Sequence, residues 1–371
     1  TTTINNEHKK LNVPNLRFPE FQGEWEEYTL QDVVTFSNGK AHENCVNDDG
    51  DYILVNSKFV STNGQVQKRV TSQLSPLHKS QFVMVMSDLP NGKALAKCFY
   101  VEEDNKYTLN QRVCSFTSND GNVSRFLMYQ INRNKYYLRF DDGINQTNLK
   151  KSEVLSCPVF IPIVREQEKI ATLLCKIDER IATQNKIIDR LLSLIKGIAQ
   201  KIVRSNKPNV RLYECVECSS STQQESEVCE QGAYPVYGAN GIVGYLDDYN
   251  TEGEAVYIIK DGSGVGTVSY VTGKCSATGT LNTLQAKDGY SLQYLYYLLK
   301  VFNFEPYKTG MAIPHIYFKD YGKAKVFCPS YTEQLQYARL LSAIDSKLSV
   351  EKNTLRNLSL QKQYLLRQMF I

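Results

Sequence analysis

The sequence predicts an α+β protein with a pseudo-two-fold repeat, in which two globular mixed α/β domains are separated by two long antiparallel helices that form a coiled coil. Two observations predict this fold. A helical pattern at residues 166–202 returns without gaps at residues 333–369, an offset of 167 residues. Turn-rich sequence with short β-type runs precedes each copy. One domain followed by one long helix is therefore expected twice.

The repeat extends beyond the helices. At the same offset Val159-Phe160 falls on Val326-Phe327, Pro162 on Pro329, Glu166-Gln167 on Glu333-Gln334, Ile177-Asp178 on Ile344-Asp345, Ser124 on Ser291, Tyr129 on Tyr296 and Ile131 on Leu298. Further upstream, Leu30 matches Leu212 and Val34 matches Val216 at an offset of 182. The first domain is therefore expected to carry about 15 extra residues in its interior.

Each helical copy has one apolar stripe, with apolar residues at steps of three or four, as in the seam of a coiled coil. The first seam is Ile170, Leu173, Ile177, Ile181, Gln184, Ile188, Leu191, Ile195, Ile198 and Ile202. The second is Tyr337, Leu340, Ile344, Leu348, Glu351, Leu355, Leu358, Lys362, Leu365 and Met369. We expect the seams to be buried against each other, with homodimerisation as the alternative. Gln184 and Glu351 are equivalent polar interruptions that fix the register.

Five segments follow from this pattern. They are a flexible arm (1–14), a first globular domain (15–157), a central linker and long helix (158–207), a second globular domain (208–327) and a distal linker and long helix (328–371). Because the termini of a domain often lie close together, the second helix is expected to start where the first ends and to run antiparallel to it. Such a rod would be roughly 50 Å long.

Composition sets only wide limits on function. The chain has 42% hydrophobic and 22% charged residues, and its net charge of +4 permits nucleic-acid binding without requiring it. The polar start TTTINNEHKK is no signal peptide, and no run of 18 apolar residues predicts a membrane span. We therefore expect a cytoplasmic protein that does not enter a membrane.

Metal, nucleotide and catalytic motifs are missing. Cys215 and Cys218 form a single CxxC pair, short of the four ligands of a structural zinc site, so we expect reduced structural thiols and no metal. The glycine run at residues 261–266 lacks the ending of a phosphate-binding loop and is predicted to be a β-hairpin turn. No protease, esterase, methyltransferase or nuclease motif is present, which favours a binding protein over an enzyme. His315, equivalent to Asn148, is expected to have a framework role.

Candidate DNA-binding residues are basic, amide, hydroxyl and aromatic side chains in turn-rich stretches. Lys and Arg neutralise phosphates, while amide and hydroxyl groups reach base edges in the major groove. In the first domain the candidates are Lys68, Arg69, Lys93, Lys97, Arg112, Arg133, Lys135 and Arg139. In the second domain they are Tyr237, Asn240, Lys260, Ser263, Lys274 and Lys308. The alternative for each basic residue is a solvated surface charge.

Several motifs recur in one order. They are LRFPEFQGEW, Gly143-x-x-Gln-Thr-Asn-Leu149 and Pro162-x-x-x-Glu166-Gln167, followed in the second round by Gly310-Met-Ala-Ile-Pro-His-Ile316 and Pro329-x-x-x-Glu333-Gln334. In this order, from about Leu16 to Ile371, the chain resembles the specificity subunit of type I restriction-modification systems.

The resemblance implies a non-catalytic DNA-binding subunit. Two target-recognition domains would each read one half of a bipartite site on double-stranded DNA, while the helical pair sets the spacer and docks the modification subunits. Implied partners are two methyltransferase subunits that modify adenine N6 with S-adenosylmethionine, and restriction subunits that use ATP and Mg. The chain itself would bind no cofactor. Alternatives are a stand-alone DNA methyltransferase or nuclease with an unrecognised motif, and an adaptor that binds only proteins.

Overall fold

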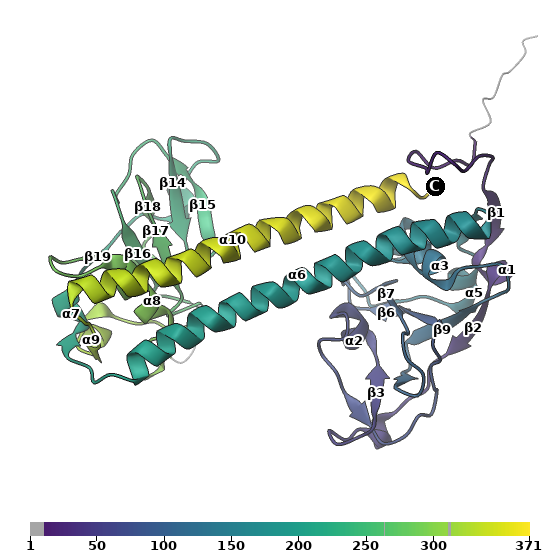
Figure 1. The fold of residues 1–371 in the computed structure, drawn as a ribbon, viewed down its shortest axis with the longest axis horizontal. Helices are drawn as coiled ribbons and strands as arrows, with labels where there is room; N and C mark the ends of the chain where they lie inside the picture. Colours follow the sequence, from purple (N-terminus) through teal and green to yellow (C-terminus); the bar gives the residue numbers. More distant parts are fainter. Residues whose placement is uncertain (1–10, 263, 311–312) are drawn as a thin grey trace, which may run out of the picture. The chain divides into compact units, whose positions relative to one another are not determined.

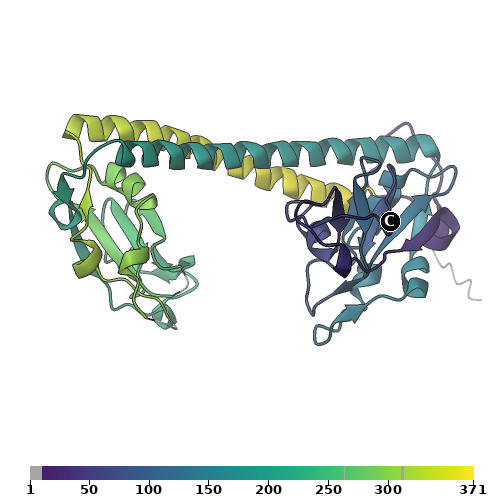
Figure 2. The same ribbon diagram turned by 90° about the horizontal axis from the view of Figure 1, so that it is seen from below.

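A computed structural model of the chain describes residues 11–262, 264–310 and 313–371. The chain divides into two compact units. Unit 1 runs up to Ala182 and includes Arg356–Ile371, and unit 2 is Thr183–Leu355. Two long helices, α6 (Val164–Arg204) and α10 (Tyr331–Gln368), each contribute residues to both units (Figure 1). Figure 2 shows the same elements in a view turned by 90°.

Unit 1 is built on a four-stranded antiparallel sheet of order β2-β9-β5-β7. Its strands are β2 (Val34–Asn38), β9 (Val113–Ser118), β5 (Phe82–Val85) and β7 (Cys98–Tyr100). A smaller sheet of order β4-β3-β8 consists of β4 (Arg69–Val70), β3 (Tyr52–Val55) and β8 (Tyr107–Leu109), with β3 and β8 parallel. Two short antiparallel pairs join β1 (Glu26–Thr29) to β11 (Pro158–Ile161) and β6 (Ser87–Asp88) to β10 (Thr147–Asn148). The short helices are α1 (Leu30–Val33), η1 (Glu43–Cys45), α2 (Ser57–Ser61), α3 (Ser124–Ile131), α4 (Lys135–Leu138) and α5 (Lys151–Leu155).

Unit 2 repeats this plan with a sheet of order β13-β19-β16-β17. Its strands are β13 (Val216–Ser220), β19 (Leu281–Ala286), β16 (Ala255–Ile259) and β17 (Val268–Val271). The smaller sheet, β15-β14-β18, consists of β15 (Gly241–Leu246), β14 (Tyr234–Gly238) and β18 (Ser276–Ala277), again with one parallel pair. Strands β12 (Val210–Arg211) and β20 (Lys325–Val326) form a short antiparallel pair. The short helices are α7 (Leu212–Cys215), η2 (Glu225–Glu227), α8 (Leu292–Lys300), η3 (Glu305–Tyr307) and α9 (Phe318–Tyr321).

One of the two inner strands of each large sheet, β5 in unit 1 and β16 in unit 2, consists of apolar and aromatic residues, and its position explains why. Every residue of β5 (FVMV) and of β16 (AVYII) is buried. A strand covered on both faces needs apolar residues at successive positions, so the alternation typical of half-exposed strands is absent. These two strands therefore connect the core clusters on either side of each sheet.

The start of each repeat confirms the offset of 182 residues. Leu30 N donates to Cys157 O at 2.8 Å, and Leu212 N donates to Ala324 O at 3.0 Å. Both residues begin a one-turn helix that leads into the first strand of the large sheet. An acidic side chain in each turn, Asp32 in unit 1, accepts from the backbone N–H before the helix.

The predicted match between α3 and α8 is wrong by one residue. Val123 N donates to the Gln167 side chain and Ser291 N donates to the Gln334 side chain, each at 2.9 Å. These partners are 44 residues apart in unit 1 and 43 apart in unit 2. Unit 1 therefore has one more residue between the short helix and α6. Consequently Ser124, Tyr129 and Ile131 do not match Ser291, Tyr296 and Leu298, because each equivalent lies one residue further along α8.

Segments of α6 and α10 pack together in each unit. In unit 1 Ile170 and Leu174 share a core cluster with Met369 and Leu365. In unit 2 the Gln184 amide donates to the backbone O of Glu351 at 3.1 Å and also to its carboxylate.

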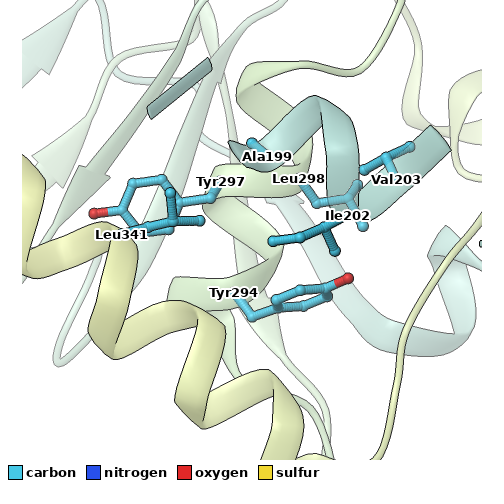
Figure 3. A pocket seen from close by; sticks show the side chains of 7 residues that line it. All are labelled: Ala199, Ile202, Val203, Tyr294, Tyr297, Leu298 and Leu341. Atoms are coloured by element: carbon cyan, nitrogen blue, oxygen red, sulfur yellow. The ribbon is translucent and has the colours of Figure 1, made fainter. Parts of the chain in front are cut away.

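Figure 3 shows Ala199 and Leu341 lining one small apolar cavity of unit 2. Gln184 of α6 contacts Glu351 of α10, and Ala199, later in α6, lies near Leu341, earlier in α10. The two segments of unit 2 therefore run in opposite directions. The cavity holds about 10 Å³, the volume of about one water molecule, so it is a packing defect rather than a ligand site.

The predicted seam residues lie on the packed side of the helices with one exception. Buried or half-buried are Ile170, Ile177, Ile181, Ile188, Leu191, Ile344, Leu348, Leu355, Leu358 and Leu365. Leu340, however, is 50% exposed, whereas Leu341 is 1% exposed. The placement of Leu340 in the seam is therefore wrong. Near its start α10 packs against the globular part of unit 2 through Ala338 and Leu341. The buried face of α10 at this point therefore includes Leu341 in place of Leu340.

Part of the expected N-terminal arm belongs to unit 1. Residues 1–10 of the arm lie outside the described residues. Asn12 accepts a hydrogen bond from Trp25 N at 2.8 Å, and Leu16 N donates to Gln368 O at 2.8 Å. Among the described helices, none is both long enough and apolar enough to cross a membrane.

Candidate nucleic-acid interface

Equivalent connections in the two units carry candidate DNA-binding residues. Residues 86–97 lead from β5 to β7, and residues 260–267 lead from β16 to β17. Each connection is held at its base by the Gly-containing motif that recurs in the sequence, because Leu149 N donates to Met86 O at 2.8 Å and Ile316 N donates to Lys260 O at 2.9 Å. The same framework thus presents a different loop in each unit.

In unit 1 the loop is fixed by its own polar groups. The Asp88 carboxylate accepts from the backbone N–H groups of Ala94 at 2.6 Å and Leu95 at 3.1 Å. A Cβ atom on Gly92 would lie 2.1 Å from this carboxylate, so a larger residue there would displace the Asp88 side chain. Lys93 follows at the loop tip and is exposed. A fixed loop with an exposed ammonium loses little entropy on binding a phosphate.

Arg133 and Lys97 stabilise this loop through hydrogen bonds to backbone oxygens. Arg133 Nη1 donates to Gly92 O at 3.2 Å and to Leu95 O at 3.1 Å. Lys97 Nζ donates to Ser61 O at 2.8 Å. Burial lowers the pKa of Lys97, and the nearby positive charges of Arg133 and Lys362 lower it further. Both side chains are engaged with backbone oxygens, so they position the loop and add positive potential rather than reach outward.

The remaining candidates of unit 1 are exposed. Lys68, Arg112 and Lys135 lie on the surface. Arg69 donates to Gly50 O at 3.0 Å. The Arg139 guanidinium lies 4.1 Å from the centre of the Tyr136 ring.

The candidates of unit 2 differ in their partners. Lys308 pairs with Glu305 at 2.6 Å, and Lys274 lies 3.8 Å from Glu252. Lys260 is half-buried, and its ammonium has no ion pair within the part of the chain that the structure describes. Ser263 lies outside the described residues. Lys260 is therefore a cation of this loop whose charge no carboxylate among the described residues neutralises.

The β14–β15 hairpin separates its two candidates. Asn240 is exposed at the hairpin tip, before Gly241, whose φ of 99° is readily adopted only by glycine. Tyr237 is half-buried, with its ring 5.7 Å from the Tyr257 ring in a narrow cleft of about 50 Å³. Asn240 is therefore accessible to a ligand, whereas Tyr237 is mainly a packing residue.

The glycine run and the recurring motifs have structural roles. The run joins antiparallel strands β16 and β17, with Gly266 N donating to Ile259 O at 2.9 Å, which confirms the predicted hairpin turn. His315 exchanges backbone hydrogen bonds with Thr309 at 2.8 and 2.9 Å. The equivalent Asn148 accepts from the Ser87 hydroxyl at 2.6 Å. Both residues therefore belong to the framework, as expected.

The two cysteines of the CxxC pair, Cys215 and Cys218, lie in different environments. Cys215 Sγ lies 3.8 Å from Cys328 Sγ in the core of unit 2. Cys218 is on β13, where burial raises the pKa of its thiol to about 11. No group of three His, Cys, Asp or Glu residues among 11–262, 264–310 and 313–371 is arranged to hold a metal ion.

Sequence reasoning missed the residues that shape the unit 1 loop. Asp88 and Gly92 determine where Lys93 lies, yet the sequence identified only a turn. Their signal was the run Asp88-Leu-Pro-Asn-Gly92, in which a carboxylate precedes a Pro-Asn-Gly turn and can accept from its N–H groups.

The family model described as the type I restriction modification DNA specificity domain matches residues 22–193 and 209–359. The chain belongs to this family. It is 27% identical over 117 residues to the EcoprrI type I restriction enzyme specificity subunit of Escherichia coli, a match that covers 32% of this chain and 29% of the relative. It is 25% identical over 256 residues to a putative type I specificity subunit of Mycoplasma genitalium, covering 63% of this chain and 66% of the relative.

Among solved structures, a type I restriction-modification S subunit from Mycoplasma genitalium has the same fold. The TM-score is 0.66 at 18% sequence identity, over 97% of this chain and 99% of that one. The two DNA specificity domains of the family model coincide with the two structural repeats. Each covers one globular region and a large part of the long helix that follows it.

Proposed function

We propose that the chain is the DNA sequence-specificity subunit of a type I restriction-modification complex. Each globular domain reads one half of a bipartite site on double-stranded DNA. The observation that supports this most directly is one framework that occurs twice with a different loop at the same place. Equal frameworks allow one mode of DNA approach, and unequal loops give two different half-sites.

We assign the phosphate contacts to cations of both domains. In unit 1 these are the exposed Lys68, Lys93, Arg112 and Lys135, and in unit 2 the half-buried Lys260. Their charges attract the DNA backbone and fix the position of the domain without reading sequence. Amide side chains on turns, of which Asn240 is exposed, read base edges.

The helices set the distance between the half-sites. We propose that α6 and α10 pair along their length as an antiparallel coiled coil. At a rise of about 1.5 Å per residue, the 41 residues of α6 span roughly 60 Å, more than one turn of B-DNA at about 34–36 Å. The hydrogen bonds between Gln184 and Glu351 support this pairing, because a polar pair in an apolar seam fixes its register.

The partners carry the chemistry. The helices and the adjoining framework dock two methyltransferase subunits, and restriction subunits join the assembly. S-adenosylmethionine, ATP and Mg²⁺ belong to those partners, and this chain is not catalytic by itself. Relatives that bear the name of specificity subunits support this assignment.

A domain exchange tests the modular reading of DNA. Residues 210–327 are replaced by the second domain of another family member, and the complex with methyltransferase subunits is assayed by mapping methylated adenines. The exchange should change one half-site only, and the reciprocal exchange of residues 15–157 should change only the other. A change in both half-sites after either exchange contradicts the proposal.

The helices are tested by deletion. Removal of seven residues in register from α6 and α10 should shorten the spacer while both half-sites stay the same. An unaltered spacer contradicts the role of the helices. Methylation or cleavage by the purified chain alone, with S-adenosylmethionine or a divalent ion, would instead identify a stand-alone enzyme.

A further inference from the structure

Unit 2 has an open groove between β17, α8 and α10. Its volume is about 240 Å³. The lining includes three tyrosine rings, an amide and a carboxylate, from Tyr270, Tyr296, Tyr297, Gln293 and Asp345. Small-molecule sites in proteins commonly hold about 300–1,000 Å³, so the groove suits a single side chain better than a cofactor.

The same place in unit 1 can be identified from the strand pairing. Tyr270 pairs with Val256, and Tyr100 pairs with Phe82, in each case next to the central strand of the large sheet. The Gln167 and Gln334 contacts place Arg125 of α3 at the position of Gln293 of α8.

The helix contacts agree with this assignment. The Tyr129 hydroxyl donates to Asp178 at 2.8 Å, and the Tyr297 hydroxyl donates to Asp345 at 3.3 Å. Burial raises the pKa of both tyrosines, and the facing carboxylates raise it further. Two of the three groove tyrosines and the carboxylate thus have counterparts in unit 1, whereas Met128 stands at the place of Tyr296.

In unit 1 the chain's own cations occupy this place. The Arg125 guanidinium lies 3.9 Å from the centre of the Tyr100 ring and pairs with Glu102. Lys362 of α10 pairs with Asp178 and lies 5.4 Å from the centre of the Tyr129 ring. Both tyrosine rings and the carboxylate therefore have a positive partner.

Unit 2 keeps the acceptors and lacks both cations. Gln293 stands in place of Arg125, and the apolar Ile195 stands at the repeat position of Lys362. No ion pair involves Asp345 within residues 11–262, 264–310 and 313–371. Lys300 Nζ lies 4.9 Å from the centre of the Tyr296 ring and 6.0 Å from that of Tyr297, but Lys300 does not line the groove and forms no ion pair with Asp345 within the described residues.

We propose that this groove binds an arginine side chain of the methyltransferase partner, an inference that rests on the proposed function. A planar guanidinium stacks on tyrosine and pairs with a carboxylate through several N–H groups, which a lysine ammonium does less well. The partner thereby supplies in unit 2 the cation that unit 1 supplies itself.

The principal test fills the groove from within. Gln293→Arg copies the arrangement of unit 1, and Asp345→Asn removes the carboxylate charge while an oxygen remains to accept from Tyr297. Gln293→Arg should weaken binding of the methyltransferase subunit roughly tenfold, the combined loss of one exposed ion pair and one cation–π contact, and Asp345→Asn, which removes the ion pair alone, up to about fivefold. Gln231→Arg adds the same charge at an exposed position outside the groove, so it is the matched control and should bind within twofold of the native chain. Thermal unfolding shows that the variants are folded.

A small probe separates this inference from the proposed function. N-acetylarginine amide is titrated into the full chain, and the tyrosine ring signals are followed by NMR, with N-acetylcitrulline amide as the uncharged control. Saturable binding of the arginine probe alone, lost in Gln293→Arg, supports the groove even if no methyltransferase binds. Equal effects of both probes, or methyltransferase binding unchanged in Gln293→Arg and Asp345→Asn, overturns it. Failure of the native chain to bind methyltransferase contradicts the proposed function instead.

Discussion

A buried ion pair fastens the N-terminal segment of unit 1 to the start of α6. Arg17 Nε donates to Glu166 Oε1 at 2.8 Å, and Arg17 Nη2 donates to Glu166 Oε2 at 2.7 Å. The Glu166 side chain is 0% exposed and the Arg17 side chain 13% exposed. The hydrogen bond to Glu166 raises the pKa of Arg17, so the guanidinium stays charged. This contact gives a structural reason for the arginine in the LRFPEFQGEW motif.

Removal of Arg17 should be costly because it leaves a carboxylate buried without a counter-charge. Breaking a buried pair in this way costs about 3–5 kcal/mol. Lys169 and Glu20 join the same two segments and provide the matched control, because their side chains are 45% and 42% exposed. An exposed pair contributes about 0–1 kcal/mol, and the Lys169 contact over the Phe18 ring adds about 0.5–1 kcal/mol. We expect Arg17→Ala to destabilise unit 1 clearly more than Lys169→Ala.

Tryptophan fluorescence during urea unfolding measures this difference. The chain has one tryptophan, Trp25, which is 1% exposed in unit 1, so its signal reports this unit and not unit 2. The double variant Arg17→Met with Glu166→Leu should recover most of the loss, since no charge is then left buried. Equal losses for Arg17→Ala and Lys169→Ala, or a double variant less stable than Arg17→Ala, would refute the reasoning.

Two further predictions concern DNA binding and pH. Lys93→Ala and Lys260→Ala should each reduce the slope of log DNA affinity against log salt concentration by about 0.9 in the reconstituted complex. Lys274→Ala is the control and should leave the slope unchanged, because Lys274 pairs with Glu252. Unchanged slopes for the Lys93 and Lys260 variants would show that these residues do not contact the DNA. The hydrogen bond from Lys347 holds the pKa of Glu351 below its usual value. The ionised Glu351 carboxylate therefore stabilises the folded state fully above the unfolded-state pKa of about 4.3, and this stabilisation is lost as pH falls through the lower folded-state pKa. Glu351→Gln should therefore flatten the acid-induced loss of unit 2 stability seen by circular dichroism, and an unchanged pH profile would contradict this.

The framework could be predicted because each of its residues has the same task in both repeats. Gln167 and Gln334 each accept from the backbone N–H of the residue that caps the start of a short helix and donate to the proline oxygen five residues earlier, at 2.9 Å in both units. A glutamine with two such partners is constrained in both copies. The repeated Pro-x-x-x-Glu-Gln pattern therefore marked a true structural equivalence.

The register errors have a common cause. At Tyr296 and Tyr297, and again at Leu340 and Leu341, identical residues stand side by side, so the sequence alone matches either one. The structure distinguishes them by contacts: Tyr297 reaches Asp345, and Leu341 packs against the globular part of unit 2. Steps of three and four are equally compatible with a helical stripe, and only the surface opposite the helix decides between them.

The candidate site was less predictable because the role of a cation depends on partners distant in sequence. Arg133 and Lys93 look alike as basic residues in turns. Arg133 is drawn inward by carbonyl oxygens 38 and 41 residues away, whereas the Asp88 turn leaves Lys93 exposed. Lys97 likewise meets Ser61, 36 residues away. Such long-range contacts leave no local pattern in the sequence.

The two repeats therefore agree in backbone and differ in charge. Unit 1 pairs its tyrosine rings and Asp178 with Arg125 and Lys362, while at the equivalent surface of unit 2 Asp345 has no ion-pair partner among the described residues. Two identical partner subunits would meet similar shapes but different electrostatics on these surfaces. Because charge complementarity governs specificity and association rate more than total affinity, the partner at unit 2 should associate with the stronger dependence on salt. A duplicated framework can in this way order the assembly of identical partners.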